Sequence, residues 1–507
     1  MRTSKNSWTK TMIELLGQAA TDLLSLQTIL FLFLGVIVGL VFGVIPGLGG
    51  TTALALLLPL TFGMQVIDAF AMAGGIMGAV AMGGSISAIL LNAPGTAPSA
   101  ATCLDGYPLA QQGRAAEAIG AVATASPLGG LFGVLTLLLV LPLAREIVLL
   151  FGPPEFFLLA VFGIVTVAMS DSQNLLRGLI AAGVGLMLAF VGYDDVHGGV
   201  RFTFGSNYLW DGIPLIPSLV GLFGMAEMIG LSIKGGTVAA DTAAVRLDGV
   251  VSGVRATLRH WKVVIRGSLT GTLIGAIPGV GGTVATFIAY STTKKADRDP
   301  DSFGTGRIEG VVAPESANNA KDSGALLPTL AFGIPGSAEM AVFLGILVLH
   351  GMQPGPAMFV DHVQDIYGLI LALTFAAVLA SLIGLLTVRW LAAITLVKGQ
   401  ILAPVVIAVS LVGVYAINLR PGDIVLAAIL GVLGHLMIRF DFPRLPLVIA
   451  LILGETAERG FQQSMMIGQG DWRIFLHSPT SITMLLLIIM SLSWSIVPIL
   501  RKRMTSS

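Results

Sequence analysis

The sequence predicts an all-α polytopic membrane protein with about 12 transmembrane helices, two homologous halves, broken helices and re-entrant helical hairpins. Hydrophobic residues make up 55% of the 507 residues and charged residues only 11%, whereas soluble domains carry about 25% charged residues. No compact water-soluble fold could cover so much apolar side chain. Glycine accounts for 63 of the 507 residues, a larger share than the usual value of about 7%. Such an excess of glycine is typical of closely packed and interrupted membrane helices.

Charge and cysteine content exclude several other classes of protein. Lys and Arg together number 28, as do Asp and Glu, so the chain has no net charge that would attract nucleic acid. The single cysteine, Cys103, cannot form an internal disulfide, and the sequence contains neither HExxH nor GxSxG. We therefore expect no nucleic-acid partner, no enzymatic activity and no cofactor other than a possible coupling Na⁺.

The first 27 residues predict an interfacial segment. Arg2, Lys5 and Lys10 accompany leucines and isoleucines at helical spacing, which is the pattern of an amphipathic helix lying on the membrane surface. The next apolar run, from about residue 28 to residue 45, is long enough to span a bilayer and lacks a small-residue cleavage site. It predicts a retained first transmembrane helix rather than a cleavable signal peptide.

An internal repeat is the strongest signal in the sequence. Residues 35–51 read GVIVGLVFGVIPGLGGT and residues 267–283 read GSLTGTLIGAIPGVGGT, so a shift of 232 residues superposes eight Gly, Pro and Thr positions. A second pair follows in the same order, LLNAPGTAPS at 90–99 and AFGIPGSAEM at 331–340. The predicted organisation is an interfacial segment at 1–27, a first transmembrane repeat at 28–232, a basic cytoplasmic linker at 233–262, a second transmembrane repeat at 263–460, and a C-terminal helix with a basic tail at 480–507.

The sequence is compatible with either a parallel or an inverted arrangement of the two halves in the membrane. Basic residues in the linker, such as Arg255, Arg259 and Lys262, and in the tail, such as Arg501 and Arg503, are typical of cytoplasmic loops. If the N-terminus, the linker and the tail are all cytoplasmic, each half crosses the membrane an even number of times and the halves run parallel. An inverted repeat, which is common in secondary transporters, needs an odd number of crossings.

The two PG-x-GG loops predict breaks within membrane helices. Proline lacks a backbone donor and glycine tolerates dihedral angles that end a helix. A broken helix exposes carbonyls that suit Na⁺ and N-terminal amides that suit a carboxylate. The Gly-x₃-Gly ladders before the loops are instead typical of close helix packing. The candidate ion-binding residues are Gly47, Gly49, Gly50 and Thr51 in the first loop and Gly279, Gly281, Gly282 and Thr283 in the second.

The second pair of motifs resembles the tips of two helical hairpins. Each tip follows one apolar segment and begins another, and its amide and hydroxyl side chains could hydrogen-bond a small carboxylate beside a helix N-terminus. The alternative is an ordinary tight turn among lipid headgroups. The candidate substrate-binding residues at the tips are Asn92, Pro94, Gly95, Thr96 and Ser99 in the first and Pro335, Gly336 and Ser337 in the second.

The segment 306–328 is unusually polar for its surroundings. It contains Glu315, Asn318 and Asn319, which would share one face of a helix. Small and apolar residues between the polar ones favour a packed helix over a solvated cytoplasmic loop, which is the alternative. We therefore add Asn318 and Asn319 to the candidate substrate-binding residues.

Four segments taken in order resemble the large membrane subunit of the tripartite tricarboxylate transporters. They are GVIPGLGGTTALALLLPLTF at 43–62, ILLNAPGTAPSAATCLDGYPLAQQGRAAEAIG at 89–120, IEGVVAPESANNA at 308–320 and LPTLAFGIPGSAEMAVFLGILVLHGMQPGP at 327–356. The resemblance covers roughly residues 28–460. Met77 and Met82 stand where the family pattern has aromatic residues, so the identity of the substrate is not carried over.

The resemblance implies a multi-pass protein of the bacterial inner membrane. Such a protein works with a small four-helix membrane subunit and a periplasmic substrate-binding protein that captures an organic carboxylate. The resemblance further implies secondary uptake coupled to a Na⁺ or H⁺ gradient, by an elevator-like movement. The alternative function is a self-sufficient carboxylate symporter or channel that needs no binding protein.

Overall fold

The fold is almost entirely helical. The computed structural model describes residues 14–148, 150–170, 175–194, 198–234, 249–394 and 399–504. Within these ranges the only sheet is a short antiparallel hairpin of β1 (Gly192–Asp194) and β2 (Gly199–Arg201). The predicted all-α fold is thereby confirmed.

The outer surface and the helix lengths are those of a membrane protein. Leu139, Leu386 and Trp390 are 81%, 73% and 73% exposed, and many such apolar side chains together would be unstable in water. Shorter apolar helices accompany the long ones, and the predicted number of about 12 crossings stays a prediction. In the described residues, six helical segments are long and apolar enough to cross a membrane: Leu26–Val44, Val66–Leu91, Ala115–Val148, Leu215–Ile233, Val363–Ile394 and Pro421–Arg439.

The helices of the first predicted half follow one another with short connections. They are α2 (Leu26–Val44), α3 (Gly49–Leu57), η1 (Leu58–Thr61), α4 (Val66–Leu91), η2 (Ala97–Ser99), α5 (Ala100–Gln111), α6 (Ala115–Val148), α7 (Pro153–Ala168), α8 (Leu175–Ala189), η3 (Asn207–Leu209), α9 (Leu215–Leu219), the π-helical η4 (Val220–Met225) and α10 (Ala226–Lys234).

The second predicted half and the flanking elements have a similar composition of long and short helices. They are α11 (Val250–Arg259), α12 (Trp261–Gly275), α13 (Gly281–Ala296), η5 (Pro300–Ser302), α14 (Glu309–Phe332), α15 (Ala338–Leu349), α16 (Met358–Asp361), α17 (Val363–Ile394), α18 (Gly399–Asn418), α19 (Pro421–Arg439), α20 (Arg444–Ile467), η6 (Trp472–Leu476) and α21 (Pro479–Met504).

The glycine ladders bring helices into backbone contact. Helix α2 packs along α4, and α12 packs along α14. A Cβ atom at Gly39 would lie 2.6 Å from the carbonyl oxygen of Ile76, and one at Gly271 would lie 2.4 Å from that of Ala317. Only glycine permits so close an approach. The ladder glycines therefore pack helices, while the loops that follow them are free for another role.

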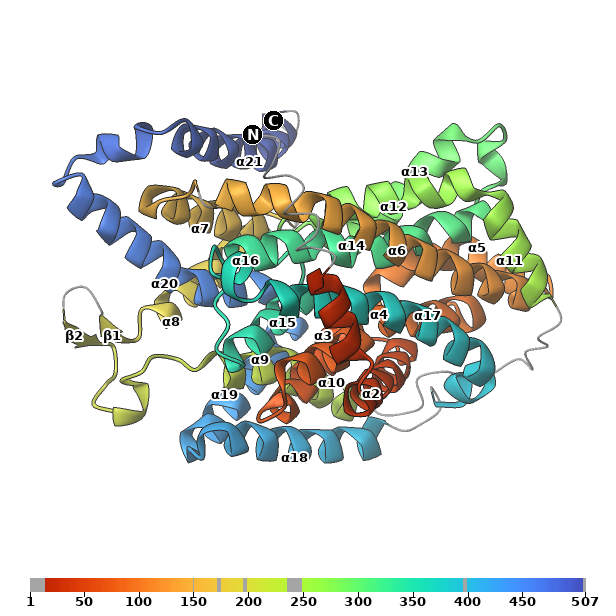
Figure 1. The fold of residues 1–507 in the computed structure, drawn as a ribbon, viewed down its shortest axis with the longest axis horizontal. Helices are drawn as coiled ribbons and strands as arrows, with labels where there is room; N and C mark the ends of the chain where they lie inside the picture. Colours follow the sequence, from red (N-terminus) through yellow and green to blue (C-terminus); the bar gives the residue numbers. More distant parts are fainter. Residues whose placement is uncertain are drawn as a thin grey trace.

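Long helices of each half pack against the opposite half. Helix α6 packs along α14, and α17 packs along α4. Helices α7 and α8 contact α20, whereas α19 contacts η4 and α10. Figure 1 shows α4, α6, α14 and α17 in the middle of the molecule, with α18 and α21 along opposite edges. The two helices that carry the predicted hairpin tips, α4 and α14, thus lie in the interior.

Several predicted segments lie partly outside the described residues. Of the interfacial segment, residues 14–23 are helical and residues 1–13 lie outside. Of the linker, residues 235–248 lie outside, and α11 packs against α6. Of the tail, residues 505–507 lie outside. The polar segment 306–328 is not a solvated loop, because from Glu309 onward it forms the largely buried helix α14.

Candidate functional site

The two PG-x-GG loops form matching breaks, one between α2 and α3 and the other between α12 and α13. The φ angles are +89° at Gly47 and +61° at Gly49, and they are +77° at Gly279 and +76° at Gly281. Side chains other than glycine rarely adopt this conformation. Each break therefore exposes the N-terminus of the next helix, where unpaired amides give a partial positive charge.

Two threonines follow the breaks directly. Thr51 and Thr283 are partly buried and lie in the first turns of α3 and α13. The backbone carbonyl of Thr283 accepts a hydrogen bond from the hydroxyl of Thr286 at 2.9 Å. Both threonines are placed where a ligand at the break would meet them.

The hairpin tips have the same backbone shape in both halves. Helix α4 ends at Asn92 with φ +52°, and α14 ends at Gly333 with φ +68°. The chain then passes through Pro94–Gly95 into η2 and α5, and through Pro335–Gly336 into α15. Both tips are tight left-handed turns that begin a new helix.

Each tip packs against the end of the helix that precedes the PG-x-GG break in its own half. A Cβ atom at Gly95 would lie 1.8 Å from the carbonyl oxygen of Gly43, and one at Gly336 would lie 2.7 Å from that of Gly275. The glycines of both tips are therefore buried and held against the ends of α2 and α12, whereas Asn92 at the start of the first tip is exposed. Backbone contact of this kind favours packed hairpin tips over turns among lipid headgroups.

The hydroxyl side chains of the two tips have different hydrogen-bond partners. The Thr96 and Ser99 hydroxyls lie 2.8 Å apart and share a hydrogen bond. The Ser337 hydroxyl accepts the backbone N–H of Met340 at 3.2 Å, which makes it the N-cap of α15. The first tip thus carries a hydroxyl cluster, whereas the second tip uses its hydroxyl to start a helix.

Each break faces the hairpin of the opposite half. A Cβ atom at Gly50 would lie 2.5 Å from Oε1 of Glu339, in the first turn of α15. A Cβ atom at Gly282 would lie 3.0 Å from Cγ of Pro98 in the first half, and 2.3 Å from Cδ of Lys321 in its own half. The structure therefore brings all four predicted motifs together around the charged side chains of α14 and α15.

Three charges lie at this meeting point, two of them buried and the third, Glu339, partly buried. The Lys321 ammonium lies 2.6 Å from Oδ1 of Asp322 and 3.6 Å from Oε2 of Glu339. The Lys321 and Asp322 side chains are only 7% and 6% exposed, so each charge depends on its partner for stability. The nearby N-termini of α3, α13 and α15 add partial positive charge. Such a site can accept an anion that competes for the ammonium and the helix ends.

A third carboxylate, Glu315, also belongs to α14 and is completely buried. Its Oε1 accepts a hydrogen bond from Ser85 at 2.5 Å and another from Thr102, both in the first half. The Ser85 hydroxyl oxygen lies 3.4 Å from that of Ser99, which links Glu315 to the hydroxyls of the first tip. Oε2 of Glu315 has no hydrogen-bond partner.

The two predicted asparagines are buried without partners for their amides. Asn318 and Asn319 are 2% and 4% exposed, and neither amide nitrogen forms a hydrogen bond; nor does Oδ1 of Asn319. Buried polar groups are seldom left unpaired, so these amides are available to a ligand. The cavity beside Asn319 measures about 10 Å³, which is room for one water at most. It is lined by Gly78, Gly130, Val134, Asn319, Asp322, Ser323, Leu373 and Ala377.

Comparison with known proteins decides the family. The sequence model of the tripartite tricarboxylate transporter TctA family matches residues 29–449. This chain belongs to the TctA family. An uncharacterised 52.8 kDa protein in the TAR-I ttuC′ 3′ region of Agrobacterium vitis is 33% identical over 486 residues, which are 94% of each chain. An uncharacterised protein in the TAR-II ttuC′ 3′ region of the same organism is 32% identical over 234 residues, which are 46% of this chain and 96% of that protein. No solved structure matches the chain.

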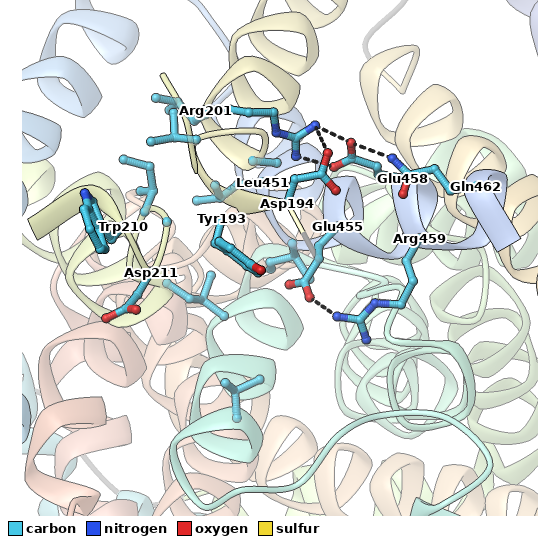
Figure 2. A pocket seen from close by; sticks show the side chains of 18 residues that line it. Tyr193, Asp194, Arg201, Trp210, Asp211, Leu451, Glu455, Glu458, Arg459 and Gln462 are labelled. Atoms are coloured by element: carbon cyan, nitrogen blue, oxygen red, sulfur yellow. Dashed lines mark hydrogen bonds and ion pairs between the residues drawn. The ribbon is translucent and has the colours of Figure 1, made fainter. Parts of the chain in front are cut away.

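This TctA-family chain has a larger cavity of about 590 Å³ beside its β-hairpin (Figure 2). Arg201 there lies between Asp194 at 3.4 Å and Glu458 at 2.6 Å, and Arg459 pairs with Glu455 at 2.5 Å. Hydrogen bonds to Glu458 raise the pKa of the Arg201 guanidinium, which keeps it charged. Four carboxylates, with Asp211 as the fourth, outnumber the two arginines. The cavity is therefore a poor anion site, and the hairpin tips of this TctA-family chain are the better candidate.

Sequence reasoning did not select several side chains of the site as ligands. Lys321, Asp322 and Glu339 are charges in apolar surroundings, and such charges mark functional sites in membrane proteins, so this signal could have identified them. Ser85 and Thr102 carried no signal, because hydroxyls are common in membrane helices. Their partner lies 230 and 213 residues away in the TctA-family sequence.

Proposed function

We propose that this chain is the large membrane subunit of a binding-protein-dependent secondary transporter of the bacterial inner membrane. It imports a small organic carboxylate, a tricarboxylate or a related anion, coupled to a Na⁺ or H⁺ gradient. Its partners are a small four-helix membrane subunit and a periplasmic substrate-binding protein. Besides membership of the TctA family, the observation that carries the proposal is the meeting of two helix breaks and two hairpin tips at Lys321.

The substrate would bind where these four motifs meet. Its carboxylates would take hydrogen bonds from the N-termini of α13 and α15 and an ion pair from Lys321. The unpaired amides of Asn318 and Asn319 would bind the polar groups that remain. Release requires that Asp322 and Glu339 again neutralise Lys321, and both already lie within 4 Å of its ammonium.

The transport cycle would be an elevator-like movement of the hairpin helices. The cavity at Asn319 is too small for a carboxylate in the present conformation, so binding needs a separation of α4 and α14 from α6 and α17. The glycine ladders of both halves meet α4 and α14 in the same register, which supports the predicted duplication. Two equivalent halves can open one shared site to each side in turn.

The decisive experiment is uptake of labelled di- and tricarboxylates into proteoliposomes. The liposomes hold the full chain with its small subunit, with or without the binding protein, under a Na⁺ gradient or a proton gradient. We expect uptake only when the binding protein and one of the two gradients are present. A matched preparation with Asn319→Ala should take up at most about a tenth as much, because one ligand hydrogen bond of about 1.4 kcal/mol is lost.

Two results would contradict the proposal. Uptake by this chain alone would identify a self-sufficient symporter or channel. Absence of carboxylate uptake by well-folded protein, in the presence of both partners and both gradients, would rule out carboxylates as the substrate class.

A further inference from the structure

Glu315 is a buried carboxylate whose charge no cationic side chain compensates. The residue is 0% exposed, and within the described ranges no Lys, Arg or His nitrogen lies within 4 Å of it. Two hydroxyl donors reach one of its oxygens, and the other oxygen has no partner. An ionised carboxylate in such a place is costly unless a cation neutralises it.

The surroundings of Glu315 provide the ligand set of a small hard cation. Ser85, Ser99 and Thr102 are completely buried hydroxyl residues of the first half. Ser85 and Thr102 hydrogen-bond the carboxylate, and Ser99 lies 3.4 Å from Ser85 and 2.8 Å from Thr96. One carboxylate among hydroxyl oxygens suits Na⁺, as oxygen ligands suit hard cations in general. The same carboxylate can instead hold a proton.

We propose that Glu315 is the anionic ligand of one monovalent-cation site, formed with the hydroxyls of Ser85, Thr102 and Ser99. The inference rests on the proposed function in one respect: this cation is the one whose gradient drives uptake. The site lies between the halves, because Glu315 belongs to α14 and the hydroxyls belong to α4, η2 and α5. Loading it would fix the first hairpin to α14, directly beside the proposed substrate site.

The second half has no equivalent of this site. The tips Pro94 and Pro335 are 241 residues apart, and the same offset relates Met72, Ile76 and Val80, which face the first ladder, to Ala313, Ala317 and Lys321, which face the second. At this offset Ser85 corresponds to Leu326, Ser99 to Met340 and Thr102 to Phe343, while Glu315 corresponds to Gly74. Each ligand is thus replaced by an apolar residue or glycine, so we expect one cation of this kind per chain.

Other charged or titratable groups near the site are already engaged or uncharged. On α5, Asp105 accepts backbone N–H groups from Gly304, Gly306 and Arg307 and the hydroxyl of Tyr290. On α14, Lys321 and Asp322 pair with each other. Cys103 on α5 is a neutral thiol at ordinary pH. Glu315 is therefore the group around the first tip whose charge state a coupling ion can change.

The test measures cation binding without substrate or binding protein. The purified full chain in detergent is heated in buffers of constant ionic strength in which Na⁺ replaces choline, over a series of pH values. We expect added Na⁺, or added protons at constant Na⁺, to raise the melting temperature of the wild type. Glu315→Gln should abolish this shift or weaken the apparent cation affinity at least about tenfold.

A matched control separates this site from buried carboxylates in general. Glu155 is also buried and accepts hydroxyl hydrogen bonds from Ser481 and Thr480 at 2.7 and 3.1 Å. It lies on α7 against α21, away from the hairpins. Glu155→Gln should therefore keep the full cation-dependent shift of the wild type.

The outcomes distinguish the two possible cations. A shift that follows Na⁺ and disappears in Glu315→Gln supports a Na⁺ site, and a shift that follows pH alone and disappears in the same variant supports a proton site. A shift that persists in Glu315→Gln, or a wild type that responds to neither cation, overturns the proposal. If Glu315→Gln does not fold, Thr102→Val and Ser85→Ala keep the carboxylate, and each should weaken cation affinity. Because no carboxylate is transported in this assay, its failure is distinct from failure of the proposed function.

Discussion

The two hairpin helices, α4 and α14, share their backbone contacts and differ in their chemistry. Gly43 of α2 faces the backbone of Val80, and Gly275 of α12 faces the backbone of Lys321 in the same way. Around these contacts α14 carries Glu315, Asn319 and Lys321, whereas α4 is made mostly of small and apolar residues. The comparison teaches that the glycine contacts maintain a common framework, while the polar chemistry is concentrated in one copy.

The two helix breaks also share a backbone shape and differ in the charged side chains beside them. Beside Gly282 of the second break lies the alkyl chain of Lys321, at 2.3 Å from a Cβ placed there. Beside Gly50 of the first break lie the Glu339 carboxylate and Val80. The second break therefore lies beside the positively charged side chain of Lys321, whereas the first lies beside the negatively charged side chain of Glu339. A mobile cation at the breaks is better accommodated at the first break than at the second.

The largest expected effect comes from what the two breaks share. Gly49→Val and Gly281→Val should each abolish uptake, because a β-branched residue does not tolerate φ values of +61° and +76°. The strain is conformational, since a Cβ at Gly281 meets no atom within 4 Å. Membrane insertion should persist, because the apolar spans are unchanged. Uptake by proteoliposomes and the amount of protein in the membrane fraction measure the two effects.

The matched control for the breaks is Gly183→Val. Gly183 lies in α8, has an ordinary helical φ, and also has no atom within 4 Å of an added Cβ. Its valine variant should transport like the wild type. Normal uptake by Gly49→Val or Gly281→Val would remove the breaks from the mechanism.

A smaller effect should test the difference between the halves. Lys321→Met leaves Asp322 and Glu339 without their cation and should destabilise the protein by about 3–5 kcal/mol, as loss of one partner of a buried ion pair does. Adding Asp322→Asn should restore part of this stability. Thermal unfolding in detergent measures both variants, with Lys295→Met, an exposed lysine at the end of α13, as the control. Equal melting temperatures for Lys321→Met and Lys295→Met would show that the buried charge is unimportant for stability.

The backbone of the site could be predicted from the sequence to a large extent. Pro and Gly at fixed spacing predicted the breaks at Gly47–Gly50 and Gly279–Gly282, because these residues have few other roles within an apolar segment. Small residues between the polar ones predicted a packed helix within segment 306–328, where the structure has α14 (Glu309–Phe332). In these cases the residue types within one short segment were sufficient to predict its backbone conformation.

The partners within the site could not be predicted in the same way. Nothing local indicates that Glu315 meets Ser85 and Thr102, because those contacts depend on the crossing of α14 with α4 and α5. Likewise, the hydroxyl of Ser337, a candidate substrate-binding residue, caps α15 in the structure, and its role in substrate binding stays a prediction. A hydroxyl at a helix start serves either role, and the sequence does not distinguish them.

An intermediate effect should separate ligand binding from stability on α14. Asn319→Ala should lower uptake about tenfold, as loss of one ligand hydrogen bond would, and should leave the melting temperature unchanged because the amide has no partner to lose. Glu309→Ala should lower the melting temperature and leave uptake unchanged. Glu309 accepts two hydrogen bonds from the Arg307 guanidinium, at 3.0 and 3.2 Å, and it lies at the N-terminal end of α14, away from the proposed substrate site. Initial rates of uptake and melting curves of the same preparations provide the comparison. Equal and minor effects on uptake would exclude the 315–319 face from the substrate site.

The smallest effect should come from the second hairpin tip, where the hydroxyl has a structural role. Ser337→Ala removes the N-cap of α15 and should cost about 1 kcal/mol, which lowers the melting temperature by a degree or two. Ser337→Thr keeps a capping oxygen and should restore most of that stability. Because the hydroxyl is engaged with the backbone N–H of Met340, the substrate concentration for half-maximal uptake should hardly change in either variant. A clear rise in that concentration for Ser337→Ala, without loss of stability, would instead mean that the hydroxyl turns toward the substrate during transport, and that the two tips act alike despite their different chemistry.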